Sequence, residues 1–553
     1  MSTTGIYGLS GSGIDVDSMV KVGMLSKQNE YDRLYKKEVK NEWLKEAYAN
    51  LYSDLATFNN STMSSYKMSS ATNPHSATST NTGAVTATAN ADAAEMSHTV
   101  KVSATASNAY MLSTEKISRA NPDAASSIYL KDILFTEGEA NALQQKISSG
   151  EINPTDTILK FSVADGAGSN HTTETISFSY EDILSNNETI YDFVSKFNNS
   201  GVNVKASYDA TNEAFALYQK DGGKENQIVL DTAGDTDNGY AKALLQKLNL
   251  GEVKSEATGS SKLTPLDFGT GTSISTQGAD AEVTIDGKKY TASSNKISVA
   301  NVTYTISSTG DSTVSVSQDT DKIIENVKKF VEDYNKMLDS LNAKYSETKY
   351  TDYDVLTKSQ ENGMSKEQID KWNEKAKSGL LQHDSNIGKL RTALREAIYT
   401  PVASVDSSYN SMMAIGIESS TDQGHLRLDE EKLKKALAAD PDCVYQLFSS
   451  SGDVTTTKNG VTKTTTDYNK EGVINRIYDK VNATMKDMKA YAGTSTQASD
   501  GSTLGTLITD LQTKMSNFKT MMDAFESALY KKYDAMESAI AKLSAQFNFV
   551  SGS

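Results

Sequence analysis

The side chains that could carry chemistry are few and scattered in this sequence. Its five histidines show neither HExxH nor any other metal-ligand spacing, so each is expected at a surface or an interface; they are His75, His98, His171, His383 and His425. The single cysteine, Cys443, has His425 as its nearest histidine in sequence. We interpret Cys443 as a small buried apolar residue rather than as a nucleophile.

Two further patterns resemble ligand sites without matching them. Asp231, Asp235 and Asp237 cluster in a glycine-containing loop, but their spacing is not that of an EF-hand, which favours a solvated acidic loop. The glycine-rich start of the chain has no preceding strand and no following GK[ST], so it does not predict a phosphate loop. The sequence therefore predicts no catalytic residue, no cofactor and no metal site, and we expect a protein that is not an enzyme.

Composition excludes several classes of partner. The chain has 553 residues and a net charge of -16, which argues against nucleic acid and against an anionic membrane surface. No apolar run reaches the roughly 18 residues of a membrane span, and the N-terminus lacks the pattern of a cleaved signal, so no membrane insertion is expected. A single cysteine does not indicate whether the protein is intracellular or extracellular, because a protein can leave the cell by a route that needs neither a signal peptide nor a disulfide.

The strongest pattern lies at the C-terminus, where apolar residues recur in alternating steps of three and four. The C-terminal seam consists of Leu504, Ile508, Leu511, Met515, Phe518, Met522, Phe525, Leu529, Tyr533, Met536, Ile540, Leu543 and Phe547. This rhythm predicts a coiled-coil helix with one stutter near Leu529. Burying one stripe gains less free energy than ordering so long a helix costs, so the helix requires partners.

We expect the outer part of this seam to bind a partner, and we call it the distal seam. It comprises Phe518, Met522, Phe525, Leu529, Tyr533, Met536, Ile540, Leu543 and Phe547. The other chain end offers a partner for the seam, because Leu44, Tyr48, Leu51, Leu55 and Phe58 repeat the same rhythm. A ragged extension precedes them, with Asp15 or Asp17 as N-cap and a charged break over 36–42. The two chain ends are therefore predicted to pack side by side.

Between the two ends, the spacing of apolar residues alternates between the strand period and the helical period. Small residues over 72–94 suggest a linker, after which 99–105 and 281–316 alternate as strands around an α+β module at 116–268. Helical patterns follow over 321–341, 365–377, 384–398, 433–437 and 473–485, while 449–469 is a hairpin tip or a loop.

The predicted fold class is therefore an α+β multidomain protein with nested domains, its terminal helices forming a coiled coil or helical bundle. Residues 1–40 and 504–553 form terminal helical legs, mobile unless assembled, and 41–72 with 319–503 form a helical-bundle domain. A β-rich domain comprises 95–115 and 269–318, and 116–268 is an inserted variable domain.

Several segments together resemble the flagellar filament-capping family, hook-associated protein 2. The opening Gly-Ser-Gly-Ile-Asp at 11–15 is similar to its start, AEVTIDGKKYTASSNKI at 281–297 to its β hairpin, and FVEDYNKML at 330–338 to one of its helices. The region 414–449 resembles the family's C-terminal part almost position for position, and 364–385 looks like the longer form of Gram-positive members. The module 116–268 matches only loosely.

The resemblance implies a structural cap at the distal, extracellular tip of the flagellar filament. Such a protein forms a ring-like homo-oligomer of about four to six copies, retains exported flagellin and promotes its folding. It leaves through the flagellar secretion apparatus without a cleaved signal, and its C-terminal helix invites a cytoplasmic export chaperone.

Other functions stay open at this point. A second axial protein, such as a hook-filament junction protein or a flagellin, shares the paired helical ends, but the YNKML and GIES segments argue against it. A surface adhesin using 116–268 is compatible with capping, and a hydrolase acting through Cys443 is a third class.

Overall fold

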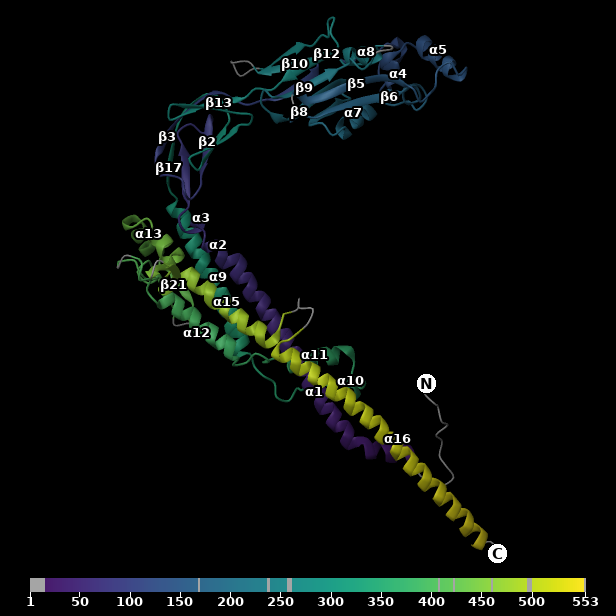
Figure 1. Cartoon of the computed structure of the whole chain (residues 1–553), viewed down its shortest axis with the longest axis vertical. Coiled ribbons are helices and arrows are strands. Elements are labelled where there is room, and N and C mark those ends of the chain that lie inside the picture. The colour runs from purple at the N-terminus through teal and green to yellow at the C-terminus, as the bar shows by residue number, and fades with distance from the viewer. Residues whose placement is uncertain are drawn as a thin grey trace. The chain divides into compact units, whose positions relative to one another are not determined.

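The computed structural model describes residues 15–167, 170–235, 239–255, 261–405, 408–420, 423–458, 461–494 and 500–551. The chain divides into two compact units (Figure 1). One unit combines both chain ends, up to Pro74 and from Asp319 onward, and the other is formed by His75–Gln318. The predicted nesting of β-rich domains between two helical ends is confirmed.

The N-terminal helix α1 (Val16–Thr57) begins as predicted and is longer than predicted. Asp15 caps it, accepting a hydrogen bond from Ser18 N at 3.0 Å. The predicted break over 36–42 is wrong, because charged side chains of that stretch find partners on neighbouring segments: Lys36 pairs with Asp354 at 3.4 Å and Glu38 accepts from Gln512 at 2.9 Å. The helix then continues as a π-helical turn, Phe58–Met63, and the short helices α2 (Ser64–Tyr66) and α3 (Ser69–Thr72).

The rest of the helical unit comes from the chain after Asp319. Its elements are α9 (Thr320–Ser346), α10 (Lys358–Glu361), α11 (Lys366–Lys377), α12 (Ser385–Tyr399), β18 (Ile417–Ser419), β19 (Leu426–Leu428), α13 (Glu430–Ala439), α14 (Cys443–Ser449), β20 (Ser451–Lys458), β21 (Val461–Glu471), α15 (Val473–Ala492) and α16 (Thr503–Ser551). Phe330 of α9 lies near the middle of the core, with its ring centroid 5.7 Å from that of Tyr66 and 5.1 Å from that of Phe448. The predicted helices are confirmed, and the described residues of 451–469 form the antiparallel strands β20 and β21 of a hairpin.

The second unit contains a β domain built from both of its ends. Its strands are β1 (His75–Ser79), β2 (Val85–Ala89), β3 (Ser97–Ala104), β13 (Ala281–Ile285), β14 (Lys288–Ala292), β15 (Lys296–Val299), β16 (Val302–Ile306) and β17 (Gly310–Gln318). They form an antiparallel sheet in the order β1-β17-β3-β13-β14 and a smaller sheet in the order β15-β16-β2. The linker predicted over 72–94 is wrong, since β1 and β2 occupy much of it and Val85 is fully buried.

An α+β module is inserted into this β domain. Its elements are β4 (Asn108–Ser113), the 3-10 turn Pro122–Ala124, α4 (Leu130–Leu134), α5 (Glu137–Ser148), β5 (Thr157–Gly166), β6 (Thr173–Ser179), α6 (Tyr180–Leu184), α7 (Ile190–Asn199), β7 (Val204–Asp209), β8 (Ala214–Gly222), β9 (Asn226–Asp231), α8 (Tyr240–Lys247), β10 (Leu250–Ser255), β11 (Ser261–Pro265) and β12 (Ser273–Gln277). The predicted hairpin closes at Asp209, whose Oδ1 accepts from Thr211 N at 2.8 Å.

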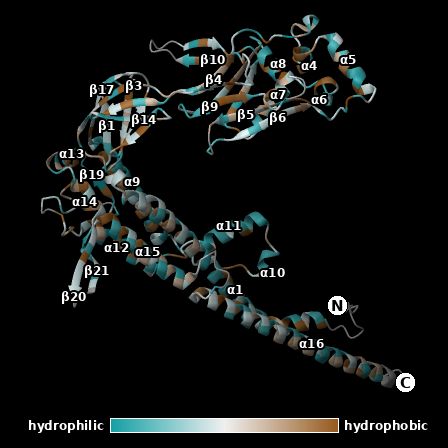
Figure 2. Ribbon diagram, turned by 45° about the horizontal axis from the view of Figure 1, so that its top comes forward, coloured by the Kyte–Doolittle hydropathy of each residue, from teal (hydrophilic) through white to brown (hydrophobic). Residues whose placement is uncertain are grey.

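Two sheets surround the core of the module, in the orders β11-β10-β4-β8-β7 and β12-β9-β5-β6. The hydrophobic stretches of β5 and β9 are visible in Figure 2. Phe161, Phe193, Phe197 and Phe215 are fully buried between the sheets. Strands β4 and β12 belong to these sheets although they lie outside the expected limits 116–268, so sheet membership places the ends of the module at 108 and 277.

Candidate functional site: the paired terminal helices

The helices α1 and α16 run antiparallel, and their cross-contacts show the register. Gln512 Nε2 donates to Glu38 Oε1 at 2.9 Å, and Lys27 Nζ lies 5.8 Å from the ring centroid of Phe518. Residue numbers fall along α1 as they rise along α16, which defines the direction of pairing. The predicted packing of the two chain ends against each other is confirmed (Figure 1).

Further out, a glycine of α1 lies against a leucine of α16. A Cβ built on Gly23 would lie 2.8 Å from Leu529 Cδ1, so the missing side chain leaves room for the leucine. Tyr530 OH then donates to Asp17 Oδ1 at 3.1 Å in the first turn of α1. Because α1 begins at Val16 and α16 ends at Ser551, α16 extends past the first residue of its partner helix.

Burial along the seam follows this geometry. Leu504, Ile508 and Leu511 at the inner end are buried, and Leu504 belongs to the bundle core. In the distal seam Met522 is buried, and five residues are half-buried: Phe518, Leu529, Tyr533, Met536 and Ile540. The remaining three are exposed: Phe525 at 39%, Leu543 at 63% and Phe547 at 73%. Within the described part of the chain, the inner half of the seam is thus covered and an apolar stripe on the outer half is open.

Three further apolar residues on the outer parts of the two helices are exposed, and sequence reasoning missed them. Met521 is 44% exposed, Val22 73% and Leu25 59%. Met521 lies three residues after Phe518 and four before Phe525, so it widens the stripe on the same side of α16. A helical projection of the sequence would have shown that Met521 lies on this side. A single series of three- and four-residue steps from Phe518 goes to Met522 and therefore omits Met521.

A hollow of about 470 Å³ lies between the outer parts of the two helices. Met24, Leu25 and Tyr31 of α1 and Met522 of α16 supply its apolar lining, with charged residues of both helices at its rim. The paired helices therefore present both a stripe and a groove to solvent.

Carboxylates form a polar layer where the pair leaves the bundle. Glu38 is only 8% exposed, and its charge together with burial raises the pKa of Glu42, burial being the larger cause. Nearby, Lys45 forms an ion pair with Asp500, and hydrogen bonding to Lys45 holds the pKa of Asp500 at about 2. A polar layer within an apolar helix interface costs stability and fixes register.

The residues considered for chemistry are dispersed. Four of the histidines lie beside carboxylates, in the pairs His75–Glu95, His98–Asp286, His171–Asp165 and His425–Asp339. His383 instead packs its ring against Tyr345, with 5.2 Å between centroids. Among the residues the structure describes, no group of three or more His, Cys, Asp or Glu side chains is placed to hold a metal ion.

Cys443 is buried as predicted, and burial raises the pKa of its thiol to about 12, which keeps it protonated at neutral pH. Asp231 and Asp235 lie near the end of β9, while Asp237 falls outside the described residues. The glycine-rich start, with the Gly-Ser-Gly-Ile part of its motif, also lies outside them.

Within the described ranges, no helix is both long and apolar enough to cross a membrane. Two chain ends paired in one helical unit, with nested β-rich domains between them, are the architecture of a multidomain structural protein.

Comparison with known proteins identifies the family. The model of the flagellar hook-associated protein 2 C-terminus matches residues 278–545, and that of its N-terminus matches residues 12–109. The chain belongs to the flagellar hook-associated protein 2 family, and its function is that of a flagellar cap protein. This is a family of structural cap proteins and not a known enzyme family.

Individual relatives show how far the similarity extends. Flagellar hook-associated protein 2 of Halalkalibacterium halodurans is 27% identical over 97% of both chains, and that of Thermotoga maritima is 23% identical over 66% of this chain and 52% of its own. The crystal structure of the D1-D2-D3 domains of the flagellar cap protein FliD from Escherichia coli is 19% identical, with a TM-score of 0.45, covering 84% of this chain and 99% of its own.

Proposed function

We propose that this chain caps the distal tip of the flagellar filament as a ring-like homo-oligomer, and that the distal seam is the surface by which its terminal helices grip the filament. The nested β domains form the plate that retains exported flagellin, which folds beneath it. The observation that carries this proposal is the apolar stripe. Its residues Phe525 and Leu543 are open to solvent on α16, which extends past the first residue of its partner helix.

The energetics favour a partner on the stripe. Fully burying a large apolar side chain gains roughly 1.5 to 3 kcal/mol, so covering a few seam residues supports specific attachment. The stripe lies on a helix and continues from residues already packed on α1, which suits a partner that adds another helix to the pair. Flagellin or another axial subunit at the filament end meets this description.

The same stripe has to be covered before export. An exposed apolar helix in the cytoplasm is an association hazard, so we infer that an export chaperone binds the C-terminal part of α16 in a groove. The flagellar secretion apparatus then delivers the chain to the extracellular tip.

The test places charges in the stripe. Phe525→Asp with Met536→Asp should abolish flagellin retention in cells lacking the native protein, because each charge would be buried unpaired at the interface at a cost of several kcal/mol. Thermal melting of the isolated chain should change little, since Phe525 is exposed and Met536 only half-buried there.

A matched control carries the same charges elsewhere on the helix. Thr520→Asp with Ser538→Asp adds two charges at exposed positions on the side of α16 away from the seam. This control should retain flagellin as the unmodified chain does. If the seam variant retains flagellin, the terminal helices are not the legs that attach the cap to the filament. If the protein attaches at the hook-filament junction instead of the tip, it is a junction protein.

A further inference from the structure

The segment between α9 and α12 forms a closed excursion from the helical bundle. Its two ends meet where Ser378 Oγ donates to Thr348 O at 2.6 Å. Next to this contact, Gly379 has a φ of +73°, and a Cβ there would lie 2.8 Å from Lys349 Cα. No residue between Leu341 and Leu381 belongs to the buried core of the bundle, so the excursion contributes no side chain to that core. Such compact loops frequently carry function rather than stability.

The excursion has a small core of its own. Trp372 Nε1 donates to Asp354 O at 2.7 Å, and the Trp372 ring lies 4.7 Å from that of Tyr353. Val355 and Leu356, which follow Asp354 in the chain, are each only 3% exposed. The aromatic residues are therefore held in place by the fold of the excursion itself.

Ion pairs fix the excursion on α1. Asp354 pairs with Lys36 at 3.4 Å, and Lys377 pairs with Glu46 at 3.1 Å. The attachment spans the charged part of α1 that sequence reasoning interpreted as a break. A site on the excursion is thereby positioned before any ligand arrives.

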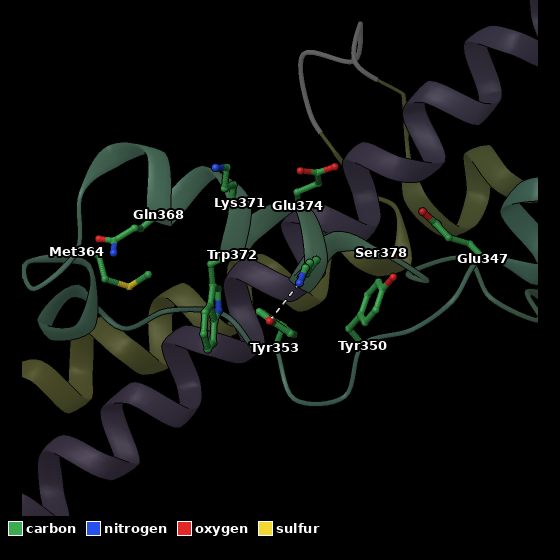
Figure 3. Close-up of a pocket in the computed structure, with 10 residues that line it drawn as sticks. Glu347, Tyr350, Tyr353, Met364, Gln368, Lys371, Trp372, Glu374 and Ser378 are labelled. Carbon is green, nitrogen blue, oxygen red and sulfur yellow. Dashed lines mark hydrogen bonds between the residues drawn. The ribbon is translucent and has the colours of Figure 1, made fainter.

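The excursion lines an open cavity of about 730 Å³, within the roughly 300 to 1,000 Å³ of small-molecule sites. Figure 3 shows Tyr353 and Trp372 side by side, with Tyr350 further along the cavity. Tyr350 is 45% exposed, and its ring centroid lies 6.2 Å from that of Tyr353 and 5.9 Å from Lys375 Nζ. Gln368 and Ser378 add polar groups to the lining.

The charges around the cavity select a neutral ligand. Glu347 and Glu374 oppose Lys371 and Lys375 in the lining, so neither an anion nor a cation is favoured overall. A cation would also compete with the Lys375 ammonium, which donates to Tyr353 OH at 3.2 Å and lies 4.7 Å from the centre of that ring.

A neutral saccharide meets both requirements of this lining. The C–H faces of a sugar ring pack on the exposed faces of tyrosine and tryptophan, and its hydroxyls exchange hydrogen bonds with carboxylate, amide and ammonium groups. We propose that the cavity of the excursion binds a neutral saccharide, with Tyr350 as a stacking platform. This goes beyond filament capping and concerns a part of the chain distinct from the distal seam.

The experiment uses tryptophan fluorescence of the full chain. Trp43 and Trp372 are the only tryptophans, so Trp43→Phe leaves Trp372 as the sole reporter. Titration with maltotriose and with triacetylchitotriose should give a saturable change with at least one of them. Tyr350→Ala should weaken that binding by about tenfold, equivalent to roughly 1.4 kcal/mol.

The control removes an equally exposed tyrosine elsewhere in the unit. Tyr445 is 40% exposed on α14, and Tyr445→Ala should leave the affinity unchanged. Saturation-transfer NMR on the unmodified chain is the second measurement, and melting curves establish that each variant folds. The proposal is overturned if neither trisaccharide binds, if Tyr350→Ala binds as tightly as its parent, or if N-acetylneuraminic acid or glucosamine binds more tightly than both neutral probes.

Discussion

Tyr530 of α16 donates a hydrogen bond to Asp17 of α1 across the helix pair, with 3.1 Å between the two oxygens. Asp17 lies in the first turn of α1, so this bond marks the place where α16 loses α1 as a neighbour. From there α16 continues to Ser551. In the described part of the chain, the pairing of the two ends thus covers the inner half of α16 and stops near Tyr530.

Amide exchange should reveal this boundary in the monomer. We predict slow exchange over 504–530, where Leu504 and Leu511 are buried, and fast exchange over 534–551, where the backbone hydrogen bonds of a lone helix open readily. Hydrogen-deuterium exchange read by mass spectrometry measures both segments at once. Sequence reasoning alone expected all of 504–553 to be mobile. Equal protection of the two halves in a proven monomer would contradict the boundary.

The ionisation of Glu471 should make the helical unit pH-dependent. Glu471 is 6% exposed, and burial, followed by the charge of Asp479, raises its pKa from 4.5 to about 7. As pH rises from 4.5 toward 7, the unfolded chain ionises while the folded carboxyl stays protonated, so the free energy of unfolding should fall by roughly 1 to 3 kcal/mol. Above about pH 7 this contribution should be constant.

Urea unfolding at a series of pH values measures the slope. Glu471→Gln cannot ionise and should flatten the curve between pH 4.5 and about 7. Exposed Glu367, which pairs only with Lys371 on the surface of α11, supplies the control Glu367→Gln. An unchanged slope in Glu471→Gln would assign the pH dependence to another group.

Arg476 should be the costliest single polar residue to remove. It is fully buried, and its guanidinium donates to the backbone carbonyls of Tyr468, Asn469, Thr400 and Pro401. It thereby joins the base of β21 to the segment after α12. Arg476→Ala leaves these carbonyls unpaired around a cavity and should cost about 3 to 5 kcal/mol.

Equilibrium unfolding in urea tests this cost. Arg476→Lys keeps the charge but not the planar fork, so it should recover only part of the loss. Arg427→Ala removes an exposed arginine from β19 and should change stability by less than about 0.5 kcal/mol. A similar loss in both alanine variants would mean that burial of Arg476 is not what matters.

Periodicity was enough to predict the long helices and most strands, because their large apolar residues recur at the helical or strand period. Phe330 and Tyr334 in α9 and Ile477 and Val481 in α15 are all core residues, as their spacing indicated. The distal seam was likewise visible in sequence, although which of its residues α1 covers depends on where α1 begins.

Two local predictions were wrong because the deciding contacts are distant in sequence. Strands β1 and β2 consist mainly of Ala, Thr and Ser, and what makes them strands is pairing with β17 and β16, more than 200 residues away. The charged stretch of α1 stays helical because partners such as Asp354 come from the excursion. A pattern of small or charged residues does not contain that information.

The aromatic excursion shows the same limit at a candidate site. Its sequence predicted only a helix over 365–377, so Tyr350 and Tyr353 lie outside any predicted element and far in sequence from Trp372. Only the closure between Thr348 and Ser378 brings Tyr350, Tyr353 and Trp372 to one cavity.

The last prediction concerns the limits of the inserted module. Ser107 and Ala279 form an isolated antiparallel bridge, with Ser107 N donating to Ala279 O at 2.9 Å. Deleting 108–277 therefore joins two ends that already touch, and the β domain should keep its fold because its core has its own buried residues, such as Val102 and Tyr304.

Deleting only 116–268 removes the strands that pair with β4 and β12 and should expose Met111 and Ile274. Melting curves and binding of a dye to apolar surface compare the two variants. The variant with the larger deletion should melt at the higher temperature and bind less dye. If the shorter deletion folds better, β4 and β12 belong to the β domain, and the module ends where the sequence pattern placed it.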